Sequence, residues 1–268
     1  MNARLIVFLV GTILSLCPPN AHAKEQDAFS KCGVTGSTTL YDLAVDRWFK
    51  TDKKDAEIQT LPASTFKIFH SLIALDVGAT KADEVFKWDG QERMLPVWNK
   101  DTIFSDAFKN STVWVYEVLA KHIDKETYRR YLAWADYEGN GNIDKGKNGN
   151  FWVYGDWGVS PQEQIEMLVK LYKNELPFSQ SSMDAVKNFM RDGNTYGKTG
   201  WTQQGENHIG WWIGYVENPE SKPLFFVTRL IKNVDEDLGN FAQCRKIITD
   251  EMIAKYQEIQ IKHDRKND

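Results

Sequence analysis

Residues 61–76 read LPASTFKIFHSLIALD, and this stretch decides how the rest of the chain is interpreted. It places Ser64 three residues before Lys67, so on a helix the two side chains share one face. The apolar residues are too dense for a surface helix, which predicts a largely buried helix over residues 64–75. Burial lowers the pKa of a lysine, and a neutral lysine can take the proton of a serine hydroxyl. The stretch therefore predicts a nucleophile with its own base, at a helix N-terminus that favours a developing oxyanion.

Two further segments supply polar side chains for such a site. Ser111 begins a predicted helix over residues 113–123, where an ordinary serine N-cap is the alternative interpretation. Residues 198–200 read Lys-Thr-Gly and lie on a predicted strand. The glycine there would let an amide of a substrate approach the backbone closely.

Strand patterns occur near both ends of the chain, and helical patterns fill the middle. Alternating segments predict strands over residues 38–43, 47–50, 196–201, 209–217 and 224–231. Helical periodicity predicts helices over residues 113–123, 126–134, 161–172 and 238–259. This order predicts an α/β fold of the α+β type, an antiparallel sheet flanked by helices with an inserted all-helical subdomain. Residues 24–60 and 182–268 would form the sheet region, and residues 61–181 the helical region, of one domain over 24–268.

The first 23 residues have the pattern of a secretory signal peptide. Arg4 precedes an apolar run over residues 5–16, and residues 21–23 read Ala-His-Ala, a small-residue cleavage site. We therefore expect a mature chain that starts at Lys24, is secreted to the periplasm and has no stable membrane span after cleavage. The formal net charge of −4 offers no basic surface for phosphates, so nucleic acid is not an expected partner.

Cysteine and histidine positions limit the remaining chemistry. Cys32 and Cys244 follow the predicted signal peptide, in a compartment that permits disulfides. The sequence leaves open whether they pair or remain two packed thiols. No cysteine or histidine spacing matches a metal motif, so no metal is expected. The oligomeric state is not predicted.

Together these motifs resemble the class D serine β-lactamases, the oxacillinase family, along nearly all of the predicted mature sequence. The matching segments occur in the family's order: PASTFK at residues 62–67, S-x-V at 111–113, FW at 151–152, YGKTG at 196–200 and GWWxG at 210–214. The resemblance implies the fold of serine β-lactamases and penicillin-binding proteins. It also implies hydrolysis of the β-lactam amide of penicillins of the oxacillin type, through a serine acyl-enzyme.

The resemblance implies a catalytic role for four residues. Ser64 would be the acylated nucleophile. Lys67 would be carboxylated by carbon dioxide, and the carbamate would serve as general base for acylation and deacylation, with no other cofactor. Ser111 would relay a proton to the β-lactam nitrogen, and Lys198 would supply positive charge near it.

Further residues take supporting roles by the same resemblance. The carbamate pocket would be kept apolar by Phe69 and Val113, and the indole N–H of Trp152 would donate to the carbamate. Backbone N–H groups of Ser64 and Trp201 would form the oxyanion hole, beside Gly200. The remaining expected substrate contacts are Thr199 and Arg245 at the carboxylate, and Met94 and Trp98 at an apolar rim.

One segment departs from the family. Members usually carry Tyr-Gly-Asn or Phe-Gly-Asn before the tryptophan motif, whereas residues 137–140 here read Tyr-Glu-Gly-Asn. The extra residue affects the expected substrate range more than the expected chemistry. Activity on carbapenems or bulky cephalosporins is not predicted from the sequence.

Several alternative functions remain at this point. A β-lactam sensor domain or a penicillin-binding peptidase forms a similar acyl-enzyme and does not turn it over. A class A β-lactamase needs Ser-Asp-Asn, which Ser-Asp-Ala at residues 105–107 matches only in part. A serine hydrolase with a histidine base is disfavoured because no G-x-S-x-G motif occurs.

Overall fold

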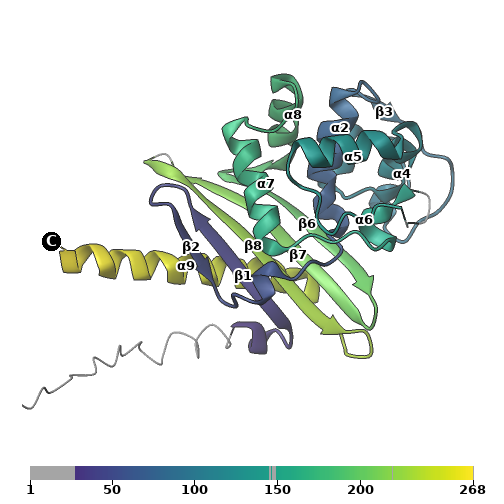
Figure 1. Ribbon diagram of the computed structural model, residues 1–268. Coiled ribbons are helices and arrows are strands. Elements are labelled where there is room, and N and C mark those ends of the chain that lie inside the picture. The colour runs from purple at the N-terminus through teal and green to yellow at the C-terminus, as the bar shows by residue number, and fades with distance from the viewer. Residues whose placement is uncertain (1–27, 145, 147–148, 219, 268) are drawn as a thin grey trace, which may run out of the picture.

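The computed structural model describes residues 28–144, 146, 149–218 and 220–267. An antiparallel sheet forms one region, and a group of helices beside it forms the other (Figure 1). This confirms the α+β architecture expected from the order of strand and helix patterns. The predicted signal peptide, residues 1–23, lies outside the described residues.

The main sheet has six strands in the order β2-β1-β8-β7-β6-β5. Every neighbouring pair is antiparallel. The expected hairpin near the N-terminus and the expected three-strand meander near the C-terminus are therefore confirmed, and β1 joins them by pairing with β8. The strands are β1 Thr35–Asp42, β2 Arg47–Lys50, β5 Arg191–Asp192, β6 Thr195–Gln204, β7 Asn207–Asn218 and β8 Ser221–Asn233.

Two long helices cover the two faces of this sheet (Figure 1). Helix α7, Pro161–Lys173, and helix α9, Phe241–Asn267, both contact β8. Consecutive residues of β7 and β8 are buried as a result, because both faces of these central strands are covered. Ser160 begins α7 with a capping box, in which its hydroxyl accepts from the Glu163 N–H and the Glu163 side chain accepts from the Ser160 N–H.

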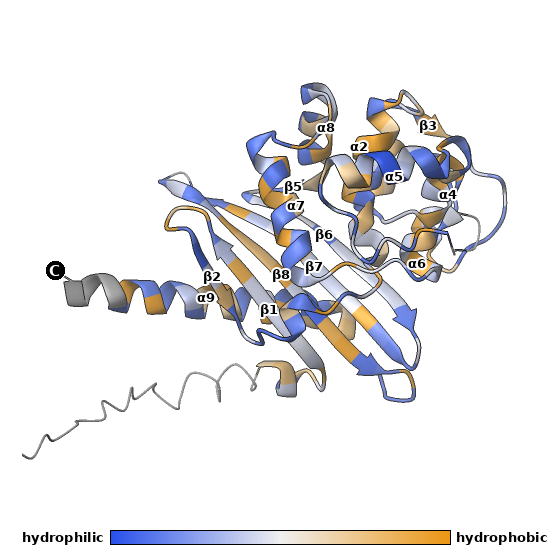
Figure 2. Cartoon of the chain, in the orientation of Figure 1, coloured by the Kyte–Doolittle hydropathy of each residue, from blue (hydrophilic) through white to orange (hydrophobic). Residues whose placement is uncertain are grey.

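The helical region is built around α2, Lys67–Asp76, in which eight residues are buried. Much of α2 is coloured as hydrophobic in Figure 2, as the dense apolar pattern predicted. Helices from the middle of the chain surround it, and a two-stranded sheet lies at its outer edge. These elements are α3 Phe104–Lys109, α4 Val113–His122, α5 Lys125–Trp134, α6 Phe151–Tyr154, α8 Gln180–Met190, β3 Val85–Phe86 and β4 Thr102–Ile103; three short 3-10 helices are η1 Asp55–Glu57, η2 Ala63–Phe66 and η3 Pro96–Trp98.

The sequence prediction differs from the structure at several places, and the short elements α3, α6, β3 and β4 were not predicted. The nucleophile segment begins as the 3-10 helix η2 and becomes α-helical only at Lys67. Helix α8 was not predicted, although Ser179 caps it by accepting from the Ser182 N–H. Helix α9 extends eight residues beyond the predicted end at 259, up to Asn267.

A buried ion pair holds the segment that leads to the nucleophile. Arg229 on β8 is fully buried and pairs with the carboxylate of Asp55. Its guanidinium also donates to the backbone carbonyls of Asp55 and Ile58, and to the Thr60 hydroxyl. Because four hydrogen bonds from the two terminal nitrogens of one side chain converge on residues 55–60, β8 fixes the path of the chain into η2.

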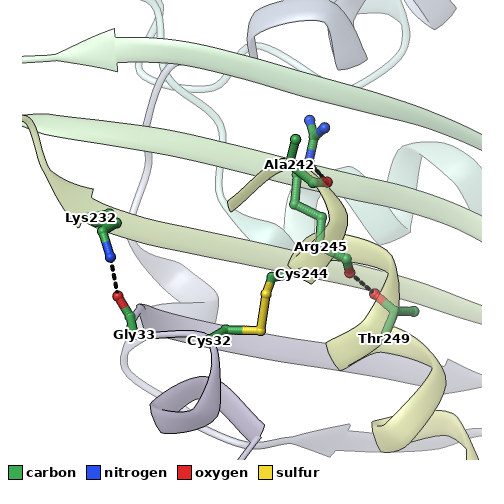
Figure 3. Close-up of a disulfide and its surroundings, with 7 residues drawn as sticks. All are labelled: Cys32, Gly33, Lys232, Ala242, Cys244, Arg245 and Thr249. Carbon is green, nitrogen blue, oxygen red and sulfur yellow. Dashed lines mark hydrogen bonds between the residues drawn. A yellow bond between two sulfur atoms is a disulfide. The ribbon is translucent and has the colours of Figure 1, made fainter. Parts of the chain in front are cut away.

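The N-terminal segment is tied to α9 by a disulfide between Cys32 and Cys244 (Figure 3). The sequence had left this pairing open. Cys32 precedes β1, and Cys244 lies in the first turn of α9, so the pairing of β1 with β8 brings the two together. Beside the bridge, Lys232 donates to the carbonyl of Gly33 at 2.7 Å.

No described helix combines the length and the apolar character that a membrane span requires.

Candidate active site

Ser64 and Lys67 meet at the junction between η2 and α2. The Lys67 Nζ donates to the Ser64 Oγ at 3.1 Å. Lys67 is fully buried, whereas Ser64 is half-buried and so remains reachable. Burial lowers the pKa of Lys67 to about 7, and the charge of Glu117 acts in the opposite direction. Near neutral pH a large share of Lys67 is therefore a neutral amine within hydrogen-bond reach of the serine.

The turn into η2 places Ser64 on a sharp bend. Ala63 has φ of +52°, a left-handed conformation that non-glycine residues seldom adopt. Thr65 stabilises the bend, because its hydroxyl donates to the carbonyl of Pro62 at 2.8 Å. Gln164 of α7 in turn donates to that hydroxyl at 2.9 Å. Strain of this kind persists only where neighbouring groups hold it, and it is common at functional sites.

Aromatic rings surround the Lys67 amine. The ring of Tyr116 on α4 lies 4.6 Å from the Nζ, measured to the ring centroid. Phe66 packs against Trp152, with ring centroids 5.3 Å apart. Trp152 also meets the buried His70 edge-on at 4.8 Å. The resulting pocket is dry and polarisable, which explains the lowered pKa of Lys67.

Phe69 lies elsewhere than the resemblance implied. Its ring packs against Tyr137 and Phe178, each with a centroid distance of 5.3 Å. Two residues along an α-helix correspond to about 200° of rotation, so Phe69 points away from Lys67. Phe66 occupies the position beside Trp152 that had been assigned to Phe69. Val113, half-buried at the start of α4, lies three residues before Tyr116 and so on the same side of that helix.

Ser111 and Lys198 form a second serine–lysine pair. The Lys198 Nζ donates a short hydrogen bond to the Ser111 Oγ and another to the carbonyl of Thr199 at 3.2 Å. Ser111 has φ of +53° and precedes α4 without capping it by a side-chain bond. The ordinary N-cap interpretation is therefore wrong. Burial, and then the positive charges of Lys67 and Arg245, hold the pKa of Lys198 well below its usual value. This lowered pKa disfavours the permanent positive charge that the resemblance implied for Lys198.

Strand β6 lies directly against η2 at Gly200. A Cβ atom built on Gly200 would lie 2.7 Å from the Pro62 carbonyl oxygen and 3.3 Å from the Thr65 nitrogen. Only glycine allows this close approach. As a result, the backbone segment that directly precedes Trp201 lies close to Ser64. The backbone N–H groups assigned to the oxyanion hole thus come from two segments in direct contact.

Replacement of Gly200 by alanine is expected to lower the rate of the chemical step, together with the stability, because the added Cβ atom would lie 2.7 Å from a backbone oxygen. The added methyl group pushes β6 away from η2, and a displacement of about 1 Å in an active site costs on the order of 100-fold in rate. Steady-state kinetics with a penicillin measures the effect. Gly205→Ala at the β6–β7 turn, where the added atom meets open space, is the control, although its φ of +58° carries a strain of its own. A Gly200→Ala rate within twofold of the Gly205→Ala rate would contradict the packing argument.

Arg245 reaches this edge from α9. Its Nη1 donates to the carbonyl of Gly200 at 2.7 Å, and its Nε donates to the carbonyl of Ala242 at 2.9 Å. In Figure 3 the guanidinium points away from the disulfide formed by the neighbouring Cys244. Burial lowers the pKa of Arg245 to about 10, so it stays charged at neutral pH. The structure thus places a cation beside Thr199, where the carboxylate of a substrate was expected.

Comparison with known proteins points to the same family as the sequence motifs do. The family described as penicillin binding protein transpeptidase domain matches residues 27–250. β-Lactamase OXA-20 of Pseudomonas aeruginosa is 44% identical over 254 residues, covering 89% of this chain and 92% of its own. This chain belongs to the class D β-lactamases.

Two solved structures are similar to this chain in fold. The class D β-lactamase of Sebaldella termitidis has a TM-score of 0.80 and 34% identity, and the match covers 89% of this chain and 96% of that one. The C-terminal domain of the Bacillus licheniformis BlaR penicillin-receptor has a TM-score of 0.77 and 29% identity, covering 85% and 94%. The same fold therefore occurs in a β-lactamase and in a receptor.

The extra residue in Tyr-Glu-Gly-Asn, residues 137–140, is accommodated in a local turn of this class D β-lactamase. Gly139 has φ of +54°, and the carbonyl of Glu138 accepts from the Trp157 indole at 2.8 Å. Trp157 packs edge-on against Phe66 at 4.9 Å. The side chain of Glu138 is exposed. The extra residue thus supports the aromatic wall around Phe66, next to Lys67, through its backbone.

The two residues assigned to the apolar rim differ in how they are held. Met94 is 84% exposed, so its position depends little on neighbouring side chains. Trp98 is half-buried, and its indole donates to the carbonyl of Asn110 at 2.9 Å, directly before Ser111. The indole of Trp114 donates to the Trp98 carbonyl at 2.9 Å. Trp98 is therefore a fixed wall near Ser111.

Sequence reasoning missed several residues of the pocket. Phe66, Tyr116, His70 and Glu117 all lie in or near the surroundings of Lys67. Phe66 belongs to the PASTFK motif but had been given no role there, and the other three belong to none of the family motifs. The spacing of Tyr116, three residues after Val113 on a predicted helix, was the one available signal. Among the described residues, no three His, Cys, Asp or Glu side chains gather as a metal site requires.

Proposed function

We propose that this enzyme hydrolyses the β-lactam amide of penicillins through an acyl-enzyme on Ser64, with a carboxylated Lys67 as general base. The observation that carries the proposal is the fully buried Lys67 amine, with a pKa of about 7, located 3.1 Å from the serine hydroxyl. Buried lysines without a partner charge are rare and are typical of functional sites.

Carboxylation needs a neutral amine. The Nζ lone pair of Lys67 attacks the carbon of carbon dioxide, one C=O π bond opens, and the amine releases one proton to solvent. The product is a carbamate anion. An N–H donor is required to hold such an anion in a pocket of aromatic rings, and the indole of Trp152 is the donor that we assign.

Acylation would follow from this arrangement. The carbamate takes the Ser64 proton as the Oγ attacks the β-lactam carbonyl carbon, and the N–H groups of Ser64 and Trp201 stabilise the oxyanion. The C–N bond then breaks, and Ser111 relays a proton to the leaving nitrogen: its hydroxyl gives one proton and recovers the one that the carbamate had taken, so the carbamate anion is restored. A carbamate on Lys67 also places a negative charge near Lys198, which favours the protonated form of that lysine. Its positive charge therefore depends on carboxylation.

Deacylation would use the same base. The carbamate takes a proton from water as the water oxygen attacks the ester carbonyl, and the proton returns to the Ser64 Oγ when the ester bond breaks. This second step separates an enzyme from a receptor. The similarity to the BlaR receptor domain supports β-lactam sensing, with a stable acyl-enzyme, as the second candidate function.

The pH dependence of activity tests the lysine assignment. At limiting bicarbonate, penicillin hydrolysis is expected to fall as the pH drops through about 7, because protonated Lys67 does not attack carbon dioxide. Added bicarbonate should restore the rate, and ¹³C-labelled bicarbonate should give a carbamate signal that Lys67→Ala lacks. Activity that is unaffected by bicarbonate down to pH 5, with no carbamate signal, would refute the assignment.

We also propose that the protein acts in the periplasm. The signal-peptide pattern of residues 1–23 supports this location. The disulfide between Cys32 and Cys244 supports it as well, since such bonds persist in oxidising compartments.

A further inference from the structure

Glu117 lies on the side of α4 that faces the carbamate pocket. It follows Val113 by one helical turn and is adjacent to Tyr116, whose ring lies 4.6 Å from the Lys67 Nζ. Glu117 is half-buried, and its Oε1 accepts a hydrogen bond from the Nδ2 of Asn150 at 2.6 Å. None of the roles assigned above uses this contact.

Asn150 is the residue from which α6 begins. It is fully buried, and its carbonyl accepts from the N–H groups of Val153 and Tyr154 at 3.1 and 3.0 Å. Helix α6 is a single turn of four residues, too short to be stable without tertiary contacts. The bond from Asn150 to Glu117 anchors one end of this turn, and a bond from the Thr202 hydroxyl to the Val153 carbonyl at 2.8 Å anchors the other.

This anchoring fixes the position of Trp152, the second residue of α6. Its indole is the donor assigned to the carbamate, so a shift of the turn moves that donor. Backbone contacts of Gly149 with α4 support the same junction, since a Cβ atom there would lie 3.3 Å from the Ala120 Cβ. The α4 face thus holds α6 at two neighbouring points, through Glu117 and Ala120.

The charge of Glu117 has a separate effect on the pocket. It favours the ammonium form of Lys67 and so opposes the lowering that burial causes. A negative charge at this place also repels a carbamate anion. Arg93 is a cation whose charge interacts with Glu117: the hydrogen bond with Asp89, with which Arg93 forms a salt bridge, raises the pKa of Arg93 most, and the Glu117 charge raises it further. Lys198 contributes positive charge from β6 when it is protonated.

We propose that Glu117 is a positioning residue that fixes Trp152 through Asn150, and that its carboxylate charge sets how much carbon dioxide the enzyme needs for activity. This inference rests on the proposed carboxylation of Lys67. The two effects oppose each other, since the hydrogen bond supports the carbamate donor while the charge disfavours the carbamate.

Two variants separate the bond from the charge. Glu117→Gln keeps an acceptor for Asn150 and removes the charge. The bicarbonate concentration for half-maximal penicillin hydrolysis is expected to fall about tenfold in this variant, because one repulsive charge near the carbamate is lost. Asn150→Ala keeps the charge and removes the bond. Its maximal rate is expected to fall about tenfold, with no decrease in the half-activating bicarbonate concentration.

All of these measurements use the purified chain. Glu258→Gln on the exposed side of α9 is the matched control, and thermal melting checks that each variant is folded. ¹³C-bicarbonate should give a stronger carbamate signal in Glu117→Gln than in the wild type at limiting bicarbonate. Equal bicarbonate requirements in Glu117→Gln and wild type would overturn the charge role, and a wild-type maximal rate in Asn150→Ala would overturn the positioning role. A wild type without bicarbonate dependence or carbamate signal refutes carboxylation itself, so the two failures are distinguishable.

Discussion

Replacement of Lys67 by alanine is expected to abolish turnover of penicillins while Ser64 remains in place. Removal of a general base costs about 10²- to 10⁴-fold, and Lys67 is assigned to both acylation and deacylation. We therefore expect a decrease of at least about 10³-fold in steady-state hydrolysis. Any acyl group that does form on Ser64 should persist, because its hydrolysis has lost the base.

The measurement combines steady-state kinetics with intact-protein mass spectrometry after addition of a penicillin. Lys81→Ala, at an exposed lysine outside the pocket, is the matched control and should keep wild-type kinetics. The pocket without the Lys67 side chain is apolar, so the variant should fold. Hydrolysis by Lys67→Ala within tenfold of the wild-type rate would rule out the lysine as the base.

Replacement of Arg229 by alanine is expected to have the largest effect on stability. The carboxylate of Asp55 would lose its partner in the protein interior, and breaking a buried ion pair by removing one partner costs about 3–5 kcal/mol. For a domain of this size such a loss lowers the Tm by roughly 10 °C. The carbonyls of Asp55 and Ile58 lose their donor as well.

Thermal unfolding followed by circular dichroism provides the test. Arg191→Ala at the exposed edge strand β5 is the control, with an expected change of about 2 °C or less. Because Arg229 fixes residues 55–60, which lead into η2, activity should also be lost at a lower temperature. A change in Tm below about 2 °C for Arg229→Ala would show that the ion pair does not hold this segment.

Local patterns in the sequence explain which parts of the site could be predicted. Ser64 and Lys67 stand three residues apart on one helical segment, so their contact follows from helix geometry alone. The apolar density of the same segment predicted the burial that lowers the lysine pKa. The strands of the C-terminal meander followed from alternation and turn residues.

Other features depend on contacts between distant segments. Lys198 on β6 meets Ser111 across 87 residues of sequence, and the packing of the helical region against the sheet brings them together. The disulfide between Cys32 and Cys244 spans 212 residues and depends on the pairing of β1 with β8. For such pairs the sequence alone gives residue types and not distances.

The assignment of Phe69 shows a different limit. The resemblance alone implied Phe69 for the apolar pocket, and helical rotation would have excluded Phe69 because it lies two residues from Lys67. Phe66, one residue before Lys67, lies in the 3-10 segment, where the residue-to-residue rotation differs from that of an α-helix. The contact of Phe66 with Trp152 therefore depends on the change from 3-10 helix to α-helix at Lys67.

The most direct test of the central claim mixes the purified protein with an excess of a penicillin at saturating bicarbonate and follows both the Ser64 adduct, by mass, and the hydrolysed product over time. We predict an acyl adduct that forms and decays, followed by sustained hydrolysis with many turnovers per protein molecule. An adduct that accumulates to one equivalent and persists, with no further hydrolysis, would contradict the account and assign the chain a β-lactam-binding role.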